Sequence, residues 1–296
     1  MHAIAKSATQ TPNPIPAESA HWLQLGGLQA WRLRARTLLP IVQGGMGIGV
    51  SAHRLAGAVA SLGGLGTISS VDLRRHHPDL MQRTNGLTPG QAAKDAIDAA
   101  NLEALAREIA LARKRAGGRG TLAINVMRAV TAYGPSITRA LECGIDAVVV
   151  GAGLPLDLPD LAREHPEAAL IPILSDARGV QLVVRKWERK KRLPDAIVIE
   201  HPRLAGGHLG AARIADLQDP RFDFENAIPQ ARAFLRSAGI EDQVPLIAAG
   251  GIRSMADIVR LQGLGAAAVQ LGTPFAVTEE GDADPAFKQV LAQATD

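Results

Sequence analysis

Short apolar segments recur along the chain, and nearly every one ends in a glycine or a polar residue. The run of branched residues from Ala196 to Ile199 is typical of a strand buried on both faces, as in a parallel sheet. Seven further segments have the same character, so the pattern predicts eight strands in all. The other seven lie within 40–49, 65–70, 121–127, 147–153, 170–175, 244–252 and 267–273.

Segments of helical period separate these strands. Leu102, Leu105 and Ile109, for example, predict one face of a helix over about 91–115. Strands that alternate with helices indicate a (β/α)8 TIM barrel. A doubly wound open sheet is the alternative, but it would concentrate ligand groups at one switch point, whereas here nearly all strand ends carry them. Further helices are expected from Ser51 to Leu62 and over 135–143, 177–192, 225–237 and 254–261.

The expected domain organisation is simple. Residues 1–20 are rich in Pro, Ser and Thr and lack an apolar signal-peptide core, so we expect a flexible N-terminal tail. Residues 21–296 then form a single barrel domain, in which the stretch from Trp22 to Leu39 could close the bottom of the barrel.

Composition narrows the class of protein. Aromatic residues make up only 3% and the net charge is +3, which disfavours a nucleic-acid partner because such proteins need stacking platforms and basic surfaces. No apolar run approaches the length of a membrane span, and Cys143 is the only cysteine, so no internal disulfide can form. We therefore expect a soluble cytoplasmic protein without a membrane partner.

Histidines are the candidate catalytic groups. His208 follows the pair Gly206-Gly207 just after the strand at Ala196–Ile199, where an imidazole could exchange a proton near neutral pH. His201 competes for this role, but we favour His208 as the catalytic residue because the glycines leave its surroundings open. Of the remaining histidines, His53 is expected at a helix start as a surface or cap residue, and the others, including His76 and His77, are expected in solvent. No cluster has zinc spacing, so no metal is predicted, and no G-x-S-x-G elbow is present.

Glycines at the strand ends predict a ligand site. Gly250-Gly251 and Gly272-Thr273 end the seventh and eighth strands, which is the usual phosphate site of barrels. The loop around Gly44, Gly45 and Met46 ends the first strand and would let a flat ring approach the backbone. Asn125 and Ser175, polar residues in apolar strands, are expected either to face this ligand or to be hydrogen-bonded in the core.

Taken together, these segments resemble the nitronate monooxygenase family, also called 2-nitropropane dioxygenase-like proteins. The resemblance spans most of the chain from Pro40. Its segments are specific for the family only when they are taken together. Two departures are a Pro-containing turn one residue longer than expected and the lack of a further Gly/Pro-rich segment that usually follows in the family. The carrying pieces are Pro40–Gly47, Gly151–Pro159, Leu204–Gly210, Ala249–Ile252 and Gln270–Glu280.

The resemblance implies an FMN-dependent oxidoreductase with His208 as its catalytic histidine. Its partners would be a nitronate or nitroalkane and O2, which it would convert to a carbonyl compound and nitrite, and a homodimer is one option for its assembly. An FMN-dependent enoyl-thioester reductase using NAD(P)H and a non-catalytic flavin-binding barrel are the alternatives. The residues implied to contact FMN are Gly44, Gly45, Met46, Asn125, Ser175, Glu200, Gly206, Gly207, Gly250, Gly251, Gly272 and Thr273.

Overall fold

Eight parallel strands close into a barrel in the computed structural model, which describes residues 15–206, 210, 211 and 213–294. Their order is β10-β3-β4-β5-β6-β7-β8-β9, and the barrel closes where Leu271 on β10 pairs with Gln43 on β3. The predicted (β/α)8 barrel is therefore confirmed. The strands are β3 (Ile41–Gln43), β4 (Leu65–Ser69), β5 (Thr121–Met127), β6 (Ala147–Gly151), β7 (Ala169–Leu174), β8 (Ile197–Glu200), β9 (Leu246–Ala249) and β10 (Ala268–Leu271).

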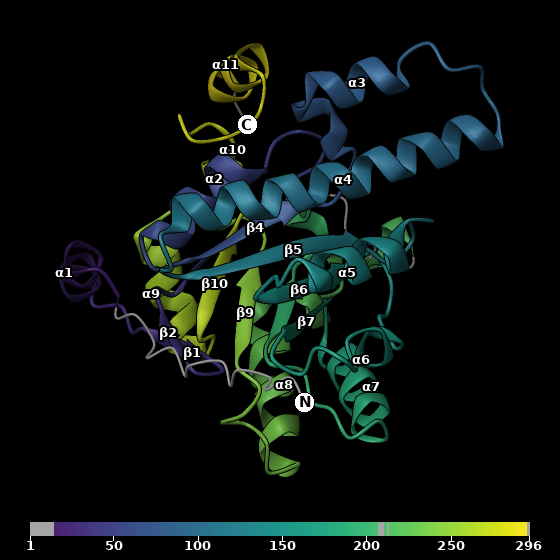
Figure 1. The fold of residues 1–296 in the computed structure, drawn as a ribbon. Helices are drawn as coiled ribbons and strands as arrows, with labels where there is room; N and C mark the ends of the chain where they lie inside the picture. Colours follow the sequence, from purple (N-terminus) through teal and green to yellow (C-terminus); the bar gives the residue numbers. More distant parts are fainter. Residues whose placement is uncertain (1–14, 207–209, 212, 295–296) are drawn as a thin grey trace, which may run out of the picture.

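Helices surround the barrel, and α4 is much longer than its neighbours, lying across β4 and β5 (Figure 1). The six main helices follow the predicted order along the chain. They are α2 (His53–Ser61), α4 (Gln91–Ala116), α5 (Tyr133–Glu142), α7 (Ala177–Glu188), α8 (Phe224–Ser237) and α9 (Met255–Leu264). Shorter or peripheral helices, which the sequence pattern did not indicate, are α1 (Ala17–Leu25), α3 (Pro78–Thr84), α6 (Leu158–Leu161), α10 (Thr273–Ala276) and α11 (Pro285–Gln293). Four 3-10 turns complete the list: η1 (Leu73–His76), η2 (Pro202–Leu204), η3 (Ile214–Gln218) and η4 (Pro220–Phe222).

Alternate residues of each strand pack on opposite sides of the barrel wall. On β8, Ile197 and Ile199 pack in the cluster formed with the surrounding helices, while Val198 belongs to the cluster inside the barrel. Because successive side chains of a strand point to opposite faces, Glu200 lies on the interior side, above Val198. The same alternation places Asn125 on β5 above Ala123.

A small antiparallel hairpin closes the bottom of the barrel. It consists of β1 (Trp31–Leu33) and β2 (Arg36–Leu38), and three of its side chains, Trp31, Leu33 and Leu38, belong to the interior apolar cluster. The indole N–H of Trp31 donates a hydrogen bond to the carbonyl oxygen of Leu39 over 2.8 Å. The predicted closure of the bottom is thus confirmed, although the sequence did not indicate the two strands.

Two further expectations need comment. Helix α1 begins at Ala17, so it overlaps the end of the range expected to be a flexible tail, while residues 1–14 lie outside the described part of the chain. The helix expected from Ser51 begins at His53, and the hydroxyl of Ser51 bonds the backbone of Met46. Within the described residues, no helix is both long enough and apolar enough to cross a membrane.

Candidate functional site

A ring of polar side chains lies one level above the apolar interior, at the carboxyl end of the barrel. The alternation along each strand puts them on the interior side, and the serines and threonine among them are buried. The carboxyl ends of barrel strands are where TIM-barrel enzymes carry their sites. The ring consists of Thr67, Ser69, Asn125, Ser175, Glu200 and Gln270.

Ser175 contributes a buried hydroxyl group to this ring. It directly follows β7, it is 6% exposed, and its hydroxyl oxygen has no hydrogen-bond partner among the described residues. The next residue, Asp176, accepts a hydrogen bond from the backbone N–H of Gly179 over 2.8 Å and so begins α7. Thr67 also has a buried hydroxyl without a partner in the described residues. Buried hydroxyls normally find partners, so these two indicate a polar ligand.

Glu200 contributes a carboxyl group that can hold a proton near neutral pH. Its burial at the end of β8 raises its pKa to about 7, because the charged form is poorly solvated there. In the protonated form the group can donate a hydrogen bond, and in the ionised form it can only accept. Glu200 is therefore suited to a ligand that presents an acceptor.

His201 is buried, and both of its ring nitrogens are engaged. Nδ1 accepts a hydrogen bond from the backbone N–H of Arg203 over 3.3 Å, and Nε2 lies 3.4 Å from a carboxylate oxygen of Asp223. The edge of the ring packs on Phe224, with ring centroids 5.9 Å apart. A neutral imidazole that carries its proton on Nε2 satisfies both contacts, so no nitrogen remains to accept a proton from a substrate.

His208 and Gly207 lie outside the described residues, so their roles stay predictions from sequence. The segment that precedes them, Ala205 to Gly206, follows η2, and among the described residues nothing lies within 4 Å of the Cβ position of Gly206. The engagement of His201 supports the choice of His208 as the reactive histidine, since the nearer imidazole is already used.

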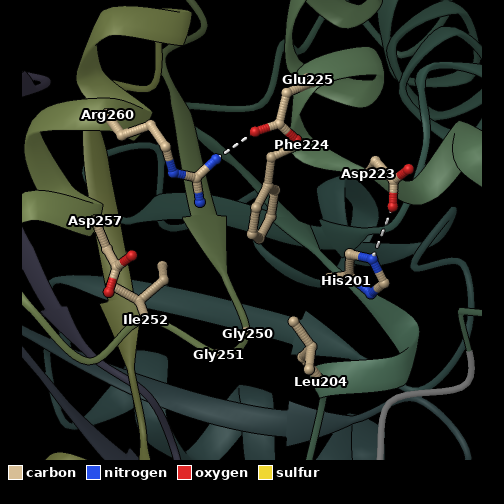
Figure 2. Close-up of a pocket in the computed structure, with 10 residues that line it drawn as sticks. All are labelled: His201, Leu204, Asp223, Phe224, Glu225, Gly250, Gly251, Ile252, Asp257 and Arg260. Atoms are coloured by element: carbon tan, nitrogen blue, oxygen red, sulfur yellow. Dashed lines mark hydrogen bonds and ion pairs between the residues drawn. The ribbon is translucent and has the colours of Figure 1, made fainter.

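A cavity of about 400 Å³ opens beside the ends of β8 and β9 (Figure 2). Gly250 and Gly251 line it in left-handed conformations, with φ of 110° and 68°, which L side chains rarely adopt. A Cβ on Gly251 would lie 2.7 Å from Cδ1 of Leu204, the movable end of an exposed side chain, so this turn requires glycine for its conformation rather than for space. The full lining is His201, Leu204, Asp223, Phe224, Glu225, Gly250, Gly251, Ile252, Asp257 and Arg260.

Charged side chains around this cavity are paired with other groups of the protein. Arg260 pairs with Glu225, and Asp257 accepts hydrogen bonds from the backbone N–H groups of Arg253 and Ser254 in the capping box of α9. Ser254 caps the helix that the sequence predicts over 254–261. Because the start of α9 is capped by its own residues, a phosphate here would depend on the N–H groups of the glycine turns rather than on this helix.

The two predicted phosphate turns lie side by side. Gly250-Gly251 follows β9 and Gly272-Thr273 follows β10, and these strands are paired, with Gln270 next to Ala249. Gly272 also precedes α10, and the backbone N–H groups of that short helix's residues Phe275 and Ala276 donate to the carbonyl oxygen of Gly272. The fold therefore brings together the residues that the sequence assigned to one ligand.

The glycine loop after β3, residues 44–49, joins the same site. The N–H of Gly44 donates to the carbonyl oxygen of Leu271 over 2.9 Å, which ties the loop to β10. A Cβ on Gly45 would lie only 2.2 Å from the Cβ of Asn125, so the loop backbone packs directly on that side chain. The sulfur of Met46 lies 3.5 Å from the Cβ position of Gly272. Predicted site residues on β3, β5 and β10 are thus brought together.

Sequence reasoning missed several members of the site. Thr67, Ser69 and Gln270 belong to the polar ring, and a step of two residues along their strands would have revealed them. Gln43 is fully buried, and its side-chain oxygen accepts a hydrogen bond from the backbone N–H of Thr67 over 2.8 Å. This bond ties β3 to β4 just below the glycine loop, and nothing in the local pattern indicated it.

Fold and site define a class: a (β/α)8 barrel with a ligand site at its carboxyl rim, where glycine turns face buried polar side chains. Comparison with known proteins specifies the family. The family model described as nitronate monooxygenase matches residues 33–296. A probable nitronate monooxygenase of Staphylococcus saprophyticus is 26% identical over 271 residues, which cover 86% of this chain and 70% of the relative.

Two solved structures share the fold. A variant of FabK from Thermotoga maritima has a TM-score of 0.61 at 22% identity, covering 86% of this chain and 68% of that one. A nitroalkane oxidase from Streptomyces ansochromogenes also has a TM-score of 0.61 at 22% identity, covering 85% of this chain and 70% of that one. The chain belongs to the nitronate monooxygenase family and is an oxidoreductase of this flavin-dependent group.

Proposed function

We propose that the protein is an FMN-dependent nitronate monooxygenase, which oxidises alkyl nitronates with O2 to a carbonyl compound and nitrite. The observation that carries this proposal is the buried hydroxyl of Ser175, which has no partner in the described part of the chain and lies in a rim that also holds the predicted glycine turns. Family membership supports the reaction class, and the rim supports a polar ligand of cofactor size.

The residues present fit FMN. Its phosphate would lie at the adjacent turns Gly250-Gly251 and Gly272-Thr273, where backbone N–H groups and the Thr273 hydroxyl are available as donors. The ring system would lie near Gly44 to Met46 and Asn125, with Ser175 and Glu200 as further polar contacts, and Gly206 and Gly207 in the segment before His208. FMN, when bound, supplies the electron transfer from the nitronate to O2.

The protein's own share is binding, orientation and proton handling. We assign to His208 the positioning of the nitronate anion, or removal of the α-proton from a neutral nitroalkane. His201 instead fixes the turn that leads to His208, because Arg203 and Asp223 occupy its two nitrogens. Because burial raises the pKa of Glu200 to about 7, both protonation states are populated near neutral pH, and the protonated form can donate a hydrogen bond to an acceptor on the ligand.

Visible spectroscopy of the purified protein with FMN tests this proposal. Anaerobic mixing with ethylnitronate should bleach the flavin, and admission of air should restore the colour with release of nitrite. His208→Ala should slow this reaction by roughly 100-fold or more, as expected for loss of a proton-transfer group. His201→Ala is the matched control and should slow it far less.

Other outcomes would point elsewhere. Rapid oxidation of NAD(P)H with an enoyl thioester, without reaction of nitronates, would assign the protein as an enoyl-thioester reductase. FMN binding without turnover of either substrate would indicate a non-catalytic flavin-binding barrel. If His208→Ala reacts with nitroethane as fast as the wild type, the role assigned to His208 is wrong.

A further inference from the structure

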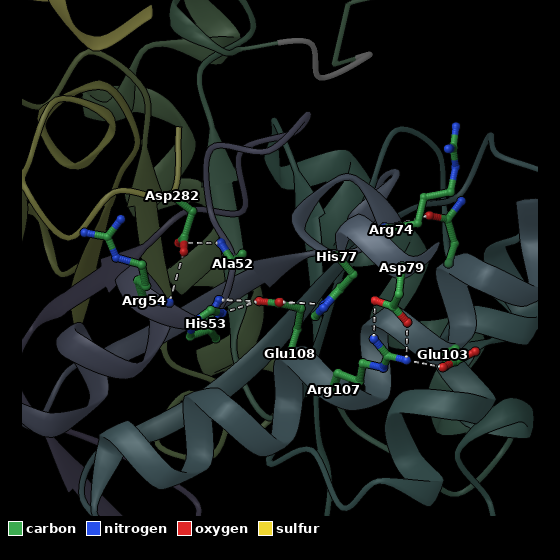
Figure 3. Close-up of polar contacts among 11 residues, drawn as sticks. Ala52, His53, Arg54, Arg74, His77, Asp79, Glu103, Arg107, Glu108 and Asp282 are labelled. Atoms are coloured by element: carbon green, nitrogen blue, oxygen red, sulfur yellow. Dashed lines mark hydrogen bonds and ion pairs between the residues drawn. The ribbon is translucent and has the colours of Figure 1, made fainter. Parts of the chain in front are cut away.

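A carboxylate lies buried between two imidazoles behind the glycine loop (Figure 3). Glu108, in the middle of α4, is 0% exposed. One of its oxygens lies 2.8 Å from Nδ1 of His53, at the start of α2, and the other lies 3.0 Å from Nε2 of His77, next to α3. His77, which was expected in solvent, is instead largely buried, whereas His53 lies partly exposed at a helix start, as expected. Three separate elements meet at this one carboxylate.

Glu108 also binds the backbone at the start of α2. Its oxygen accepts a hydrogen bond from the N–H of His53 over 2.7 Å. Asp282, near α11, accepts the N–H groups of the neighbouring residues Ala52, Arg54 and Leu55 over 2.8, 3.1 and 3.1 Å. The residue at the N-cap is Ala52, which has no side-chain acceptor, so these two distant carboxylates replace a local cap.

The start of α2 is continuous with the glycine loop. The hydroxyl of Ser51 accepts a hydrogen bond from the N–H of Met46 over 2.8 Å, and the N–H of Ser51 donates to the carbonyl oxygen of Met46 over 3.1 Å. Asp282 adds a backbone bond from its N–H to the carbonyl oxygen of Val50 over 3.1 Å. A shift of the first turn of α2 would therefore move the loop that faces the cofactor site.

The charge state of the cluster decides how firmly it holds. The hydrogen bond to Glu108 raises the pKa of His53, although burial opposes this. Burial alone would raise the pKa of Glu108, but the bond and charge of His53 outweigh it and lower the pKa. A buried carboxylate is costly unless it is paired and hydrogen-bonded, so the protonated imidazole is the stabilising state. Other charged or titratable groups facing the cluster are Arg54 on α2, His76 on η1 and Asp282.

We propose that Glu108 is a positioning residue: acting through His53, it holds the glycine loop in the shape that binds the cofactor, and it makes that hold depend on pH. The link to the cofactor rests on the proposed function, whereas the effect on the loop does not. Glu108 touches neither substrate nor cofactor in this account.

The direction of the pH effect follows from His53. A raised pKa in the folded state means that the stabilisation is fully present below the ordinary value of 6.5 and is lost as pH rises through the raised value. The glycine loop should therefore be held firmly in mildly acidic solution and loosen in alkaline solution. At much lower pH, protonation of Glu108 would also remove the interaction.

Amide hydrogen exchange over residues 44–55 tests the proposal in the protein without cofactor. After correction for intrinsic rates, protection in the wild type should fall as the pH rises from 6 to 9, because the raised pKa of His53 lies above its ordinary value of 6.5. Glu108→Gln keeps the shape and an acceptor but not the charge, so its protection should be low and independent of pH. Asp282→Asn is the matched control: it should lower protection at both pH values and leave the pH dependence in place.

A second variant covers the case in which Glu108→Gln does not fold. His53→Asn removes the titrating imidazole and should likewise remove the pH dependence of loop exchange. If either variant keeps the wild-type pH dependence of protection, the proposal is overturned. The same holds if the substitution lowers the melting temperature but leaves the pH dependence of exchange unchanged, because the effect is then purely structural.

Fluorescence titration with FMN then tests the link to the cofactor. The FMN dissociation constant of the wild type should rise with pH in parallel with loop exchange, and that of Glu108→Gln should not vary with pH. If FMN fails to bind although the loop behaves as expected, the proposed function fails and control of the loop by Glu108 stands. If FMN binds with the same pH profile in both proteins, the positioning role is overturned.

Discussion

The floor and the rim of this barrel are built from the same strands, yet they have opposite characters. The floor is hydrocarbon, with Leu38 of the β1–β2 hairpin packed beneath Val42, Ala123 and Val198. The rim, two residues further along the same strands, carries Asn125 and Glu200. Side chains two residues apart on a strand point to the same face. Positions that contribute to stability are therefore only two residues away from positions that contact a ligand. Substitutions in the two layers should therefore have separable effects.

A substitution in the floor should have the largest effect on the free energy of unfolding. Leu38→Ala leaves a cavity beneath the barrel, and we expect it to lower the free energy of unfolding by about 2–5 kcal/mol. The affinity for FMN should stay within about twofold, because the hairpin is at the opposite end from the rim. Urea unfolding and flavin titration measure the two quantities, and a large loss of affinity with unchanged stability would contradict the separation of layers.

Leu62→Ala serves as the control for that substitution, since Leu62 is 52% exposed at the end of α2. The same side chain is removed, but no cavity forms. We expect a change within about 0.5 kcal/mol in the unfolding free energy.

In the rim, Glu200 should make stability depend on pH. Its folded-state pKa of about 7 exceeds the ordinary 4.5, so the folded protein keeps the proton longer than the unfolded chain. Its contribution is therefore present below pH 4.5 and is lost as pH rises through 7. Relative to the wild type, Glu200→Gln should gain stability with rising pH, by about 3 kcal/mol between pH 4.5 and 8. Parallel urea titrations at several pH values would show whether the two curves converge in acid; a constant offset would reject this account.

Gly45→Ala should damage the rim by overpacking. The new Cβ would overlap Asn125, and relief requires a shift of the glycine loop. We expect a loss of about 1–3 kcal/mol in stability together with at least roughly tenfold weaker FMN binding. Gly134→Ala on α5 is the control, because nothing lies within 4 Å of its Cβ position; it should be neutral or stabilising by up to about 1 kcal/mol. Equal FMN affinity in both variants would show that the loop does not bind the cofactor.

The smallest effect should come from Asp223→Asn. Its carboxylate is 53% exposed and lies 3.4 Å from His201, so solvent screens the interaction. We expect the free energy of unfolding, measured by thermal unfolding, to change by less than about 1 kcal/mol. The rate of nitronate oxidation should change little. A strong loss of activity would mean that His201 takes part in proton transfer after all.

The barrel and much of its rim could be predicted from sequence, because both depend on local signals. A short apolar run predicts a strand. Ser175 and Gly251 could be predicted as site residues because each follows the end of such a run. Other features depend on partners far away in the chain. Glu108 reads as one more polar residue of a long helix, and only the fold shows that His53, 55 residues earlier, meets it in the interior. The hairpin was missed because three-residue strands carry too little pattern.

The bonds from Asp282 to α2 also set an order of events during synthesis. Ala52 emerges from the ribosome 230 residues before the carboxylate that completes its helix turn. The edge of β3 likewise waits for β10, the last strand of the barrel to be translated. A nascent chain therefore carries an open strand edge until β10 has been translated, and such an edge can pair with other chains in the meantime.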